Sequence, residues 1–292
     1  MGLRATLHTA VHSRTALVLG VAVTLAVPLL TLPNLPQVAA WPVVLGLLPW
    51  VVGKYVLCPL RWRALTDADL GRWWHMRAYA ESELLGLLTP GHVGADLWRL
   101  RRLTRTGLDR GAAVVSVGMD RIVGAIGLAV FVGFAGTSLP VHLLLPALGL
   151  LVGGGVGLLV VRKLRPQWLP ERPSLPPPRK LALGLALSAG YQLSIAALLL
   201  GAVAATGHGL DPLAILGAFG ASQLAGAIPG PNGASPRDAA LVVALAALGL
   251  PLVAAVAAVA IKAAIAWLPA LTLGGVSLFL TRRSHRAQLV PA

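Results

Sequence analysis

Three arginines with a carboxylate nearby lie beside Pro/Gly loops or inside an apolar stretch of the sequence. The pairs are Arg99 with Asp96, Arg121 with Asp120, and Arg237 with Asp238. Arginine binds phosphate through two parallel hydrogen bonds and keeps its charge in apolar surroundings. These residues predict an anion site in which the three arginines contact a phosphate and Asp120 orients Arg121.

The Asp120-Arg121 pair is the sharpest of these signals because it lies inside the apolar run 113–136. Its depth is about 12 Å at 1.5 Å per helical residue. A charge there costs about 2.5–3.5 kcal/mol on insertion scales, so each side chain should face the protein interior and have a partner. Adjacent helical residues point in different directions, so the partners are expected on other segments. The candidate partners are Glu81, Glu83 and Arg237. The alternative is a static buried network that binds no ligand.

Three further polar features have a structural alternative. Asp96 and Arg99 are three residues apart and can form a simple intrahelical pair. The run 235–238, Ser-Pro-Arg-Asp, is a capping box with proline at the first helical position, and a helix N-terminus beside Arg237 is also an anion site. Lys262 lies in the middle of the last apolar run, where it either reaches a cavity or extends toward the membrane surface.

Two segments of the chain share one sequence pattern. Residues 82–95 and 222–234 both read Ser-(Glu/Gln)-Leu-x-Gly, an apolar step, and then Pro-Gly-x-x-Gly-Ala once one residue is dropped. Glu83, the acidic residue of the first copy, is a further candidate for substrate contact. The loop residues are Pro90, Gly91, Gly94, Pro229, Gly230 and Gly233. Coincidence in a chain with 33 Gly and 22 Pro is the alternative.

The composition excludes an ordinary soluble domain as the setting for these residues. The 292 residues are 57% hydrophobic and 12% charged, whereas about a quarter of the residues in soluble domains are charged. Six apolar runs approach or exceed the roughly 20 residues that cross a bilayer. They are Thr15–Leu32, Ala40–Pro59, Ala113–Gly136, Val141–Val161, Leu181–Ala205 and Pro251–Leu280. The sequence therefore predicts an all-α polytopic membrane protein with about six full transmembrane helices.

Two other apolar runs, Tyr79–Thr89 and Pro212–Ile228, end in the Pro/Gly loops, and Ala239–Leu248 follows the second loop with only ten residues. These lengths suit half-helices or re-entrant segments better than full spans. In transporters, paired Gly/Pro-broken segments in corresponding positions of two halves indicate a binding site at the membrane midplane. We therefore expect two re-entrant segments arranged as an inverted repeat.

The net charge of +14 is explained by topology rather than by nucleic-acid binding. Basic residues gather near the N-terminus and in residues 54–77, 99–110, 162–180 and 282–286, whereas the connections 33–39, 137–140 and 206–212 have no Lys or Arg. If every basic segment is cytoplasmic, both termini are cytoplasmic and the two Pro/Gly loops enter from opposite faces.

This arrangement divides the single membrane domain, residues 1–292, into a first half 1–161, a Pro-rich cytoplasmic linker 162–180 and a second half 181–292. Within it, residues 61–77 combine arginines and tryptophans, which indicates either an interfacial amphipathic segment or a solvated loop. The first apolar run has a secretory signal peptide as its alternative interpretation.

No residue pattern indicates chemistry or a bound cofactor. Cys58 is the single cysteine, and the seven histidines show no metal-binding spacing. The sequence has no nucleophile–base constellation, phosphate loop or metal motif. We therefore predict no catalytic residue, no metal and no cofactor.

Several motifs, taken in order, resemble a known family. They are Arg61-Trp62-Arg63-Ala64-Leu65, residues 89–99, Met119-Asp120-Arg121-Ile122-Val123-Gly124, residues 228–233, Ser235-Pro236-Arg237-Asp238-Ala239 and the residues from Ala246 to Pro251. They are similar to the transmembrane, flippase-like domain of lysylphosphatidylglycerol synthases, and the match covers nearly the whole chain. The family usually has Gly-x-Arg-Glu where this chain has Ser235 to Asp238, which leaves the role of Asp238 open.

The resemblance implies an inner-membrane protein that moves an anionic lipid between leaflets, either a phospholipid or a polyprenyl-phosphate-linked lipid. The chain stops at residue 292 without the soluble aminoacyl-transferase domain of the full-length synthases, so we expect lipid translocation and no synthase activity. One alternative is a membrane subunit that assists glycosyl or aminoacyl transfer to a lipid, with a separate lipid-modifying enzyme as partner. Another is a scaffold that binds lipid without moving it. The expected partner is an anionic membrane lipid and not a nucleic acid, and the oligomeric state stays open.

Overall fold

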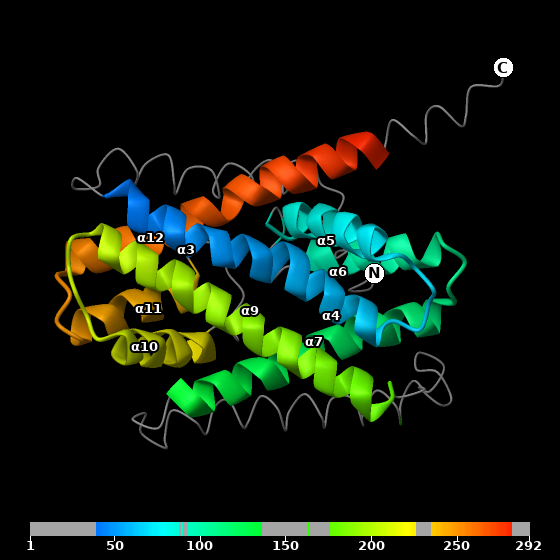
Figure 1. The fold of residues 1–292 in the computed structure, drawn as a ribbon, viewed down its shortest axis with the longest axis horizontal. Helices are drawn as coiled ribbons and strands as arrows, with labels where there is room; N and C mark the ends of the chain where they lie inside the picture. Colours follow the sequence, from blue (N-terminus) through cyan, green and yellow to red (C-terminus); the bar gives the residue numbers. More distant parts are fainter. Residues whose placement is uncertain are drawn as a thin grey trace, which may run out of the picture.

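The computed structural model describes residues 39–87, 89, 93–135, 163, 176–225 and 235–281. In these residues the chain is helical and contains no strand (Figure 1). The elements are α3 (Ala40–Val52), η2 (Gly53–Leu57), α4 (Cys58–Leu65), α5 (Arg72–Leu87), α6 (Val93–Thr104), α7 (Arg110–Ala135), α9 (Pro178–Ala205), α10 (Pro212–Leu224), α11 (Pro236–Ala247), α12 (Leu252–Pro269) and η6 (Ala270–Gly274).

Four helical stretches in the described residues are long and apolar enough to cross a membrane. They are Ala40–Leu65, Arg110–Phe131, Pro178–Ala205 and Leu252–Thr281. They coincide with four of the six predicted spans, which confirms an all-α polytopic membrane protein. The predicted spans Thr15–Leu32 and Val141–Val161 lie outside the described residues. The linker ends earlier than predicted, because Pro178 begins α9 at a position where its missing N–H has no cost.

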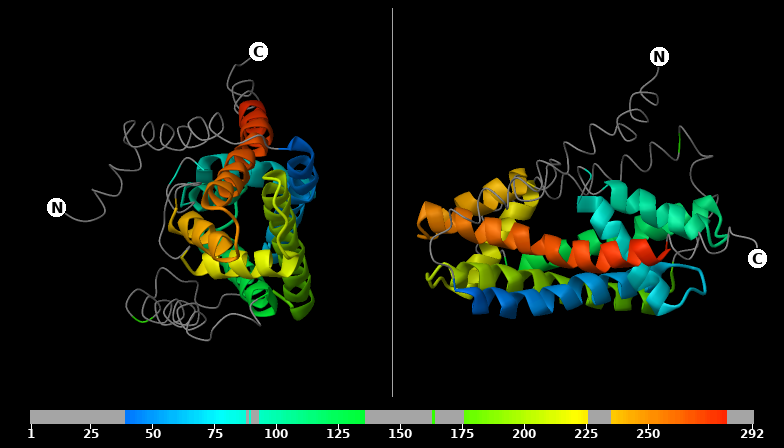
Figure 2. Two further views of the ribbon diagram at one scale, coloured as in Figure 1. Left: turned by 90° about the vertical axis from the view of Figure 1, so that its left-hand side faces the viewer. Right: turned by 90° about the horizontal axis from the view of Figure 1, so that it is seen from above.

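The predicted half-helices form two short helical pairs, α5 with α6 and α10 with α11. None of these four helices exceeds the 16 residues of α5, so each is too short to be an ordinary span. Figures 1 and 2 show the two pairs at opposite ends of the molecule's long axis. This is the placement expected if the two Pro/Gly loops enter the membrane from opposite faces.

The span Ala40–Leu65 packs against the span Pro178–Ala205 in antiparallel orientation, so that residue numbers rise along one helix as they fall along the other. The contacting pairs are Gly46 with Ala197, Gly53 with Ser194, Leu57 with Gly190, and Arg61 with Ser188. Small residues at the crossing let the two backbones approach closely, as is common between membrane helices. The antiparallel crossing agrees with the predicted inverted repeat.

Each half also has its own apolar core. The first cluster joins α4, α5, α6 and α7 around Trp62 and Leu103. The second joins α9 to α12 around Leu199 and Leu241, and it also includes Val43 of α3. A smaller cluster between them includes Trp50 and joins α3, α5 and α9. The cores hold the two halves as units on either side of the α3–α9 crossing.

Residues 61 and 62 belong neither to an interfacial amphipathic segment nor to a solvated loop, the two alternatives predicted for residues 61–77. Arg61 and Trp62 lie near the end of the span Ala40–Leu65, inside the protein. Trp62 is fully buried and donates a hydrogen bond to Ser116 at 3.1 Å. The hydropathy of the sequence falls at Arg61 and Trp62. Their burial depends on partners that other helices supply, which hydropathy does not measure. Trp73, at the start of α5, is exposed.

The ends of α10 and α11, the half-helices of the second half, follow local sequence rules. Asp211 caps α10 by accepting a hydrogen bond from the backbone N–H of Leu213. Ser235 and Asp238 form the predicted capping box at the start of α11. Gly249, with φ of +94°, lies just after the helix end, where a left-handed residue is required. These signals confirm the predicted bounds of α11 to within a few residues.

Candidate functional site

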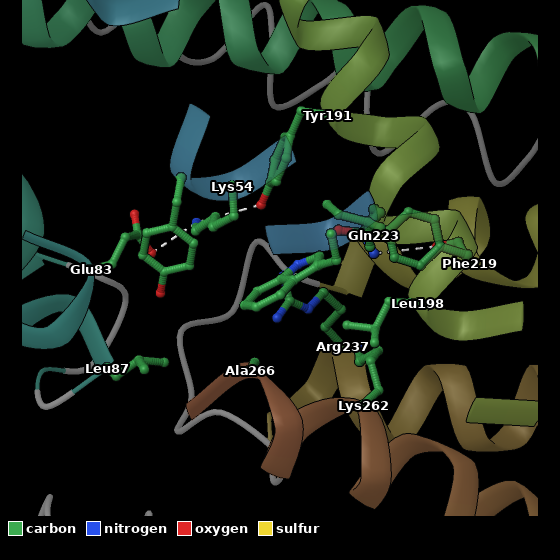
Figure 3. Close-up of a pocket in the computed structure, with 13 residues that line it drawn as sticks. Lys54, Glu83, Leu87, Tyr191, Leu198, Phe219, Gln223, Arg237, Lys262 and Ala266 are labelled. Atoms are coloured by element: carbon green, nitrogen blue, oxygen red, sulfur yellow. Dashed lines mark hydrogen bonds and ion pairs between the residues drawn. The ribbon is translucent and has the colours of Figure 1, made fainter. Parts of the chain in front are cut away.

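A cavity of about 110 Å³ lies where the two halves meet (Figure 3). Both halves contribute to its wall, through α3, η2 and α5 on one side and α9, α10, α11 and α12 on the other. Its polar lining residues are Lys54, Tyr55, Glu83, Tyr191, Gln223, Arg237 and Lys262. Its apolar lining residues are Trp50, Leu87, Ile195, Leu198, Phe219 and Ala266. The cavity is partly open, and a few charged side chains converge on an otherwise apolar wall, as in ligand-binding pockets.

Lys54 reaches the cavity from an irregular turn of the span Ala40–Leu65. Pro49 precedes the turn and lacks a backbone N–H, and residues 53–57 form a π-helical turn of the kind often found at functional sites. The ammonium of Lys54 lies 2.8 Å from a carboxylate oxygen of Glu83 and 3.4 Å from the hydroxyl of Tyr191. Figure 3 shows Lys54 between these two side chains.

The opposite wall carries a second lysine–carboxylate pair and an arginine. Lys262 of α12 lies 3.3 Å from Asp238 of α11. The same carboxylate accepts hydrogen bonds from the hydroxyl and the backbone N–H of Ser235, so the capping box also fixes the partner of Lys262. Arg237 lines the cavity, and its buried Nε has no hydrogen-bond partner among the described residues. Arg237 is therefore the cation of this wall with hydrogen-bonding capacity to offer a ligand.

The internal repeat places corresponding residues at the cavity. Glu83 follows the end of its span, Leu65, by the same number of residues as Gln223 follows Ala205, and both side chains line the cavity. The serines before them make the same bond: Ser82 donates to the carbonyl of Tyr79 and Ser222 to that of Phe219, each at 2.7 Å. The two copies thus share backbone context and differ in charge at one position.

Asp120 belongs to a separate buried cluster, and its predicted partners were wrong. Its carboxylate receives a hydrogen bond from Arg61 of α4 and one from Arg99 of α6, each at 2.7 Å. Arg61 also donates to Ser188 of α9 at 3.2 Å. The prediction that Asp120 is buried and paired was correct, but it does not orient Arg121. The bonds instead join α4, α6, α7 and α9.

Arg121 points away from this cluster because it is one residue further around the α7 helix. Its side chain is 49% exposed and lies 2.9 Å from Asp96, which also pairs with Arg99 at 2.7 Å. The predicted intrahelical pair of Asp96 and Arg99 therefore exists, extended by Arg121. We find none of these three residues in the lining of the cavity.

Glu81 ties the first half-helix to the end of the last span. It accepts hydrogen bonds from Ser277 at 2.9 Å, Thr281 at 2.8 Å and the indole of Trp98 at 2.9 Å, and Arg102 lies 3.3 Å away. These partners supply the hydrogen bonds and the opposite charge that a buried carboxylate requires. Its position is structural, and it does not contact Asp120.

Of the predicted site residues, Glu83 and Arg237 line the cavity and Asp238 lies directly behind it. Gly94 is the second residue of α6, and its N–H donates to the hydroxyl of Thr89 at 2.8 Å. Pro90, Gly91, Pro229, Gly230 and Gly233 lie outside the described residues. That they form re-entrant loops entering from opposite faces stays a prediction.

Sequence reasoning missed four polar lining residues, Lys54, Tyr55, Tyr191 and Gln223. Lys54 was assigned to a cytoplasmic basic segment. It lies in the middle of the span that begins at Ala40, because that span continues to Leu65. Gln223 is found by the repeat alone, since it occupies the position of Glu83. Tyr191 gave no signal, because a tyrosine in an apolar span is usual in a membrane protein.

The family model described as "Lysylphosphatidylglycerol synthase TM region" matches residues 17–274 of the chain. The comparison with curated proteins and the comparison with solved structures give no match.

Proposed function

Because the chain belongs to the lysylphosphatidylglycerol synthase TM-region family, we propose that it is a transporter that moves an anionic lipid between the leaflets of the plasma membrane. One observation carries this proposal: Arg237 lines a cavity between two oppositely oriented halves, and its Nε has no hydrogen-bond partner among the described residues. A buried donor of this kind is costly unless a ligand satisfies it. A lipid phosphate is the anion that a membrane-embedded cavity meets.

In this proposal Arg237 binds the phosphate, and Lys54 and Lys262 stabilise it from the two walls. The α5–α6 pair and the α10–α11 pair lie at opposite ends of the molecule, so each pair can open the cavity toward one leaflet (Figure 2). Broken helices that meet near a central site are the usual basis of alternating access. No bond is made or broken in this cycle, so the lipid leaves unchanged.

Arg237→Ala should reduce lipid transfer by at least about tenfold, because a charge-assisted hydrogen bond is worth roughly 1.5–3 kcal/mol and each 1.4 kcal/mol is tenfold. The assay uses the purified protein in vesicles with tail-labelled phosphatidylglycerol, and a membrane-impermeant quencher reports the lipid in the outer leaflet. Arg179→Ala is the matched control, since it removes an exposed guanidinium at the start of α9. It should transfer lipid at the wild-type rate.

Wild-type transfer by a folded Arg237→Ala protein would refute the assignment of the site. If the wild-type protein binds the labelled lipid but does not move it, it is a scaffold rather than a transporter. Formation of a new lipid when the purified chain is given a lipid and an activated glycosyl or aminoacyl donor would instead show an enzyme.

We also propose that both termini are cytoplasmic and that the α5–α6 pair enters the membrane from the cytoplasmic side. Residues 66–71 and 206–211 lie at opposite ends of the spans, so a cysteine in each reports one side. With a membrane-impermeant maleimide on intact cells, His208→Cys should be labelled and Asp69→Cys should be labelled only after permeabilisation. The native Cys58 is buried and should give little background. The reverse pattern would invert the proposed topology.

A further inference from the structure

We infer that the cavity selects a lipid headgroup with one negative charge, a phosphodiester, over a phosphomonoester or diphosphate with two or more. The inference rests on the proposed function and deepens it, because it names the class of anion that the site accepts. It follows from how the charged side chains around the cavity are already paired.

Two of the three cations that line the cavity have a carboxylate of their own. Lys54 lies 2.8 Å from Glu83, and Lys262 lies 3.3 Å from Asp238. All four side chains are largely buried, with at most 15% of any of them exposed. Within the protein, each lysine is thus neutralised by one acid, one pair on each wall.

Arg237 is the cation that remains. The described residues offer it no salt bridge, and its Nε has no hydrogen-bond partner there. The described cavity therefore carries one positive charge in excess. The two Pro/Gly loops, residues 88–92 and 226–234, contain no Lys, Arg, Asp or Glu, so they add no such charge to this count.

Charge balance matters here because the site lies at the middle of the spans, away from bulk water. Lys54 is near the midpoint of Ala40–Leu65 and Lys262 is well inside Leu252–Thr281. In such surroundings an uncompensated charge is far more costly than in water. A singly charged phosphodiester balances the excess of one, a dianionic phosphate leaves one negative charge, and a zwitterionic headgroup leaves one positive charge.

The repeat shows which residue sets this balance. Glu83 is acidic, whereas its counterpart Gln223 in the second half is a neutral amide of the same size and also lines the cavity. Two acidic residues at these positions would cancel the excess charge, and two amides would double it. The side chain at position 83 is therefore a specificity-determining residue, and Glu83→Gln makes the first half like the second.

The test compares three tail-labelled lipids in the vesicle assay at pH 7.5: phosphatidylglycerol with one negative charge, phosphatidic acid with two, and zwitterionic phosphatidylcholine. The second pKa of a phosphomonoester is about 6, so phosphatidic acid is largely dianionic at this pH. The wild-type protein should transfer phosphatidylglycerol at least about tenfold faster than the other two. Glu83→Gln should shift the preference toward phosphatidic acid, and Arg237→Gln toward phosphatidylcholine.

A second readout covers variants that fold but transfer slowly. Short-chain forms of the three lipids are added to the protein in detergent, and the thermal stabilisation that each one gives is measured. The order of stabilisation should follow the charge of the variant in the same way. Asp67→Asn, which neutralises an exposed acid between α4 and α5, is the control and should keep the wild-type order.

The outcomes separate this inference from the function on which it rests. Equal transfer of all three lipids by the wild-type protein, or a preference for phosphatidic acid, overturns the charge selection and leaves lipid transfer intact. An unchanged order in Glu83→Gln in both readouts also overturns it. Transfer of none of the lipids refutes the proposed function itself, and the inference with it.

Discussion

Asp120→Ala is expected to destabilise the protein by roughly 3–5 kcal/mol, the range seen when one partner of a buried ion pair is removed. The reason is that Arg61 and Arg99 both direct a guanidinium N–H at this carboxylate at 2.7 Å, and each of these arginines is almost completely buried. Without Asp120, the bond to Ser188 is the one side-chain hydrogen bond that the described residues still offer Arg61. Thermal unfolding in detergent, followed by size-exclusion chromatography, measures the loss.

Two comparisons make the interpretation specific. Asp67→Ala removes an exposed aspartate and should leave the melting temperature unchanged. The double variant Asp120→Ala with Arg61→Leu removes one of the two stranded charges and should recover part of the loss. If Asp120→Ala melts like wild type, or if the double variant is less stable than the sum of its single changes, the cluster does not stabilise the fold as we describe.

The cluster matters for the proposed transport because of the elements it joins. Asp120, Arg61 and Arg99 connect α7, α4 and α6, and Ser188 adds α9 of the other half. The bonds hold the half-helix α6 to α4, α7 and α9. None of the residues in this cluster lines the cavity. This assigns Asp120, Arg61 and Arg99 to structure and leaves the proposed ligand contact to the charges that line the cavity.

Gly46→Val is expected to disrupt the α3–α9 crossing, with a loss of about 1–3 kcal/mol or more from overpacking. A Cβ at position 46 would lie 2.6 Å from the carbonyl oxygen of Ala197 and 3.0 Å from the Cα of Leu198. Both are backbone atoms, so the whole helix must move to make room. The crossing borders the cavity through Leu198, and lipid transfer should fall together with the melting temperature.

Gly133→Val is the matched control because it lies on an exposed face of α7, with no atom within 4 Å of the position of its Cβ. It introduces the same side chain in a membrane helix and should change neither stability nor transfer. An equal loss from both substitutions would mean that valine is unfavourable in these helices in general. It would then give no support to a close crossing at Gly46.

The sequence alone was sufficient for the architecture wherever the signal is local. Hydropathy located four spans that the structure confirms, and Gly and Pro positions located the broken segments between them. These signals are strong because the membrane requires every stretch of about 20 residues that crosses it to be apolar. The capping box at Ser235 and the burial of Asp120 were predictable for the same kind of reason, since each depends on neighbours in the chain.

The pairing of charges required the tertiary structure. Asp120 meets Arg61 and Arg99, which are 59 and 21 residues away, and Lys54 meets Glu83 from another helix. Local sequence does not indicate which way a helix turns its polar residues, because that rotation is set by how close-packed helices fit together. The sequence therefore showed that charges are buried in this membrane protein, and packing decided which of them remain available to a ligand: Arg237, and not Arg99 or Asp120.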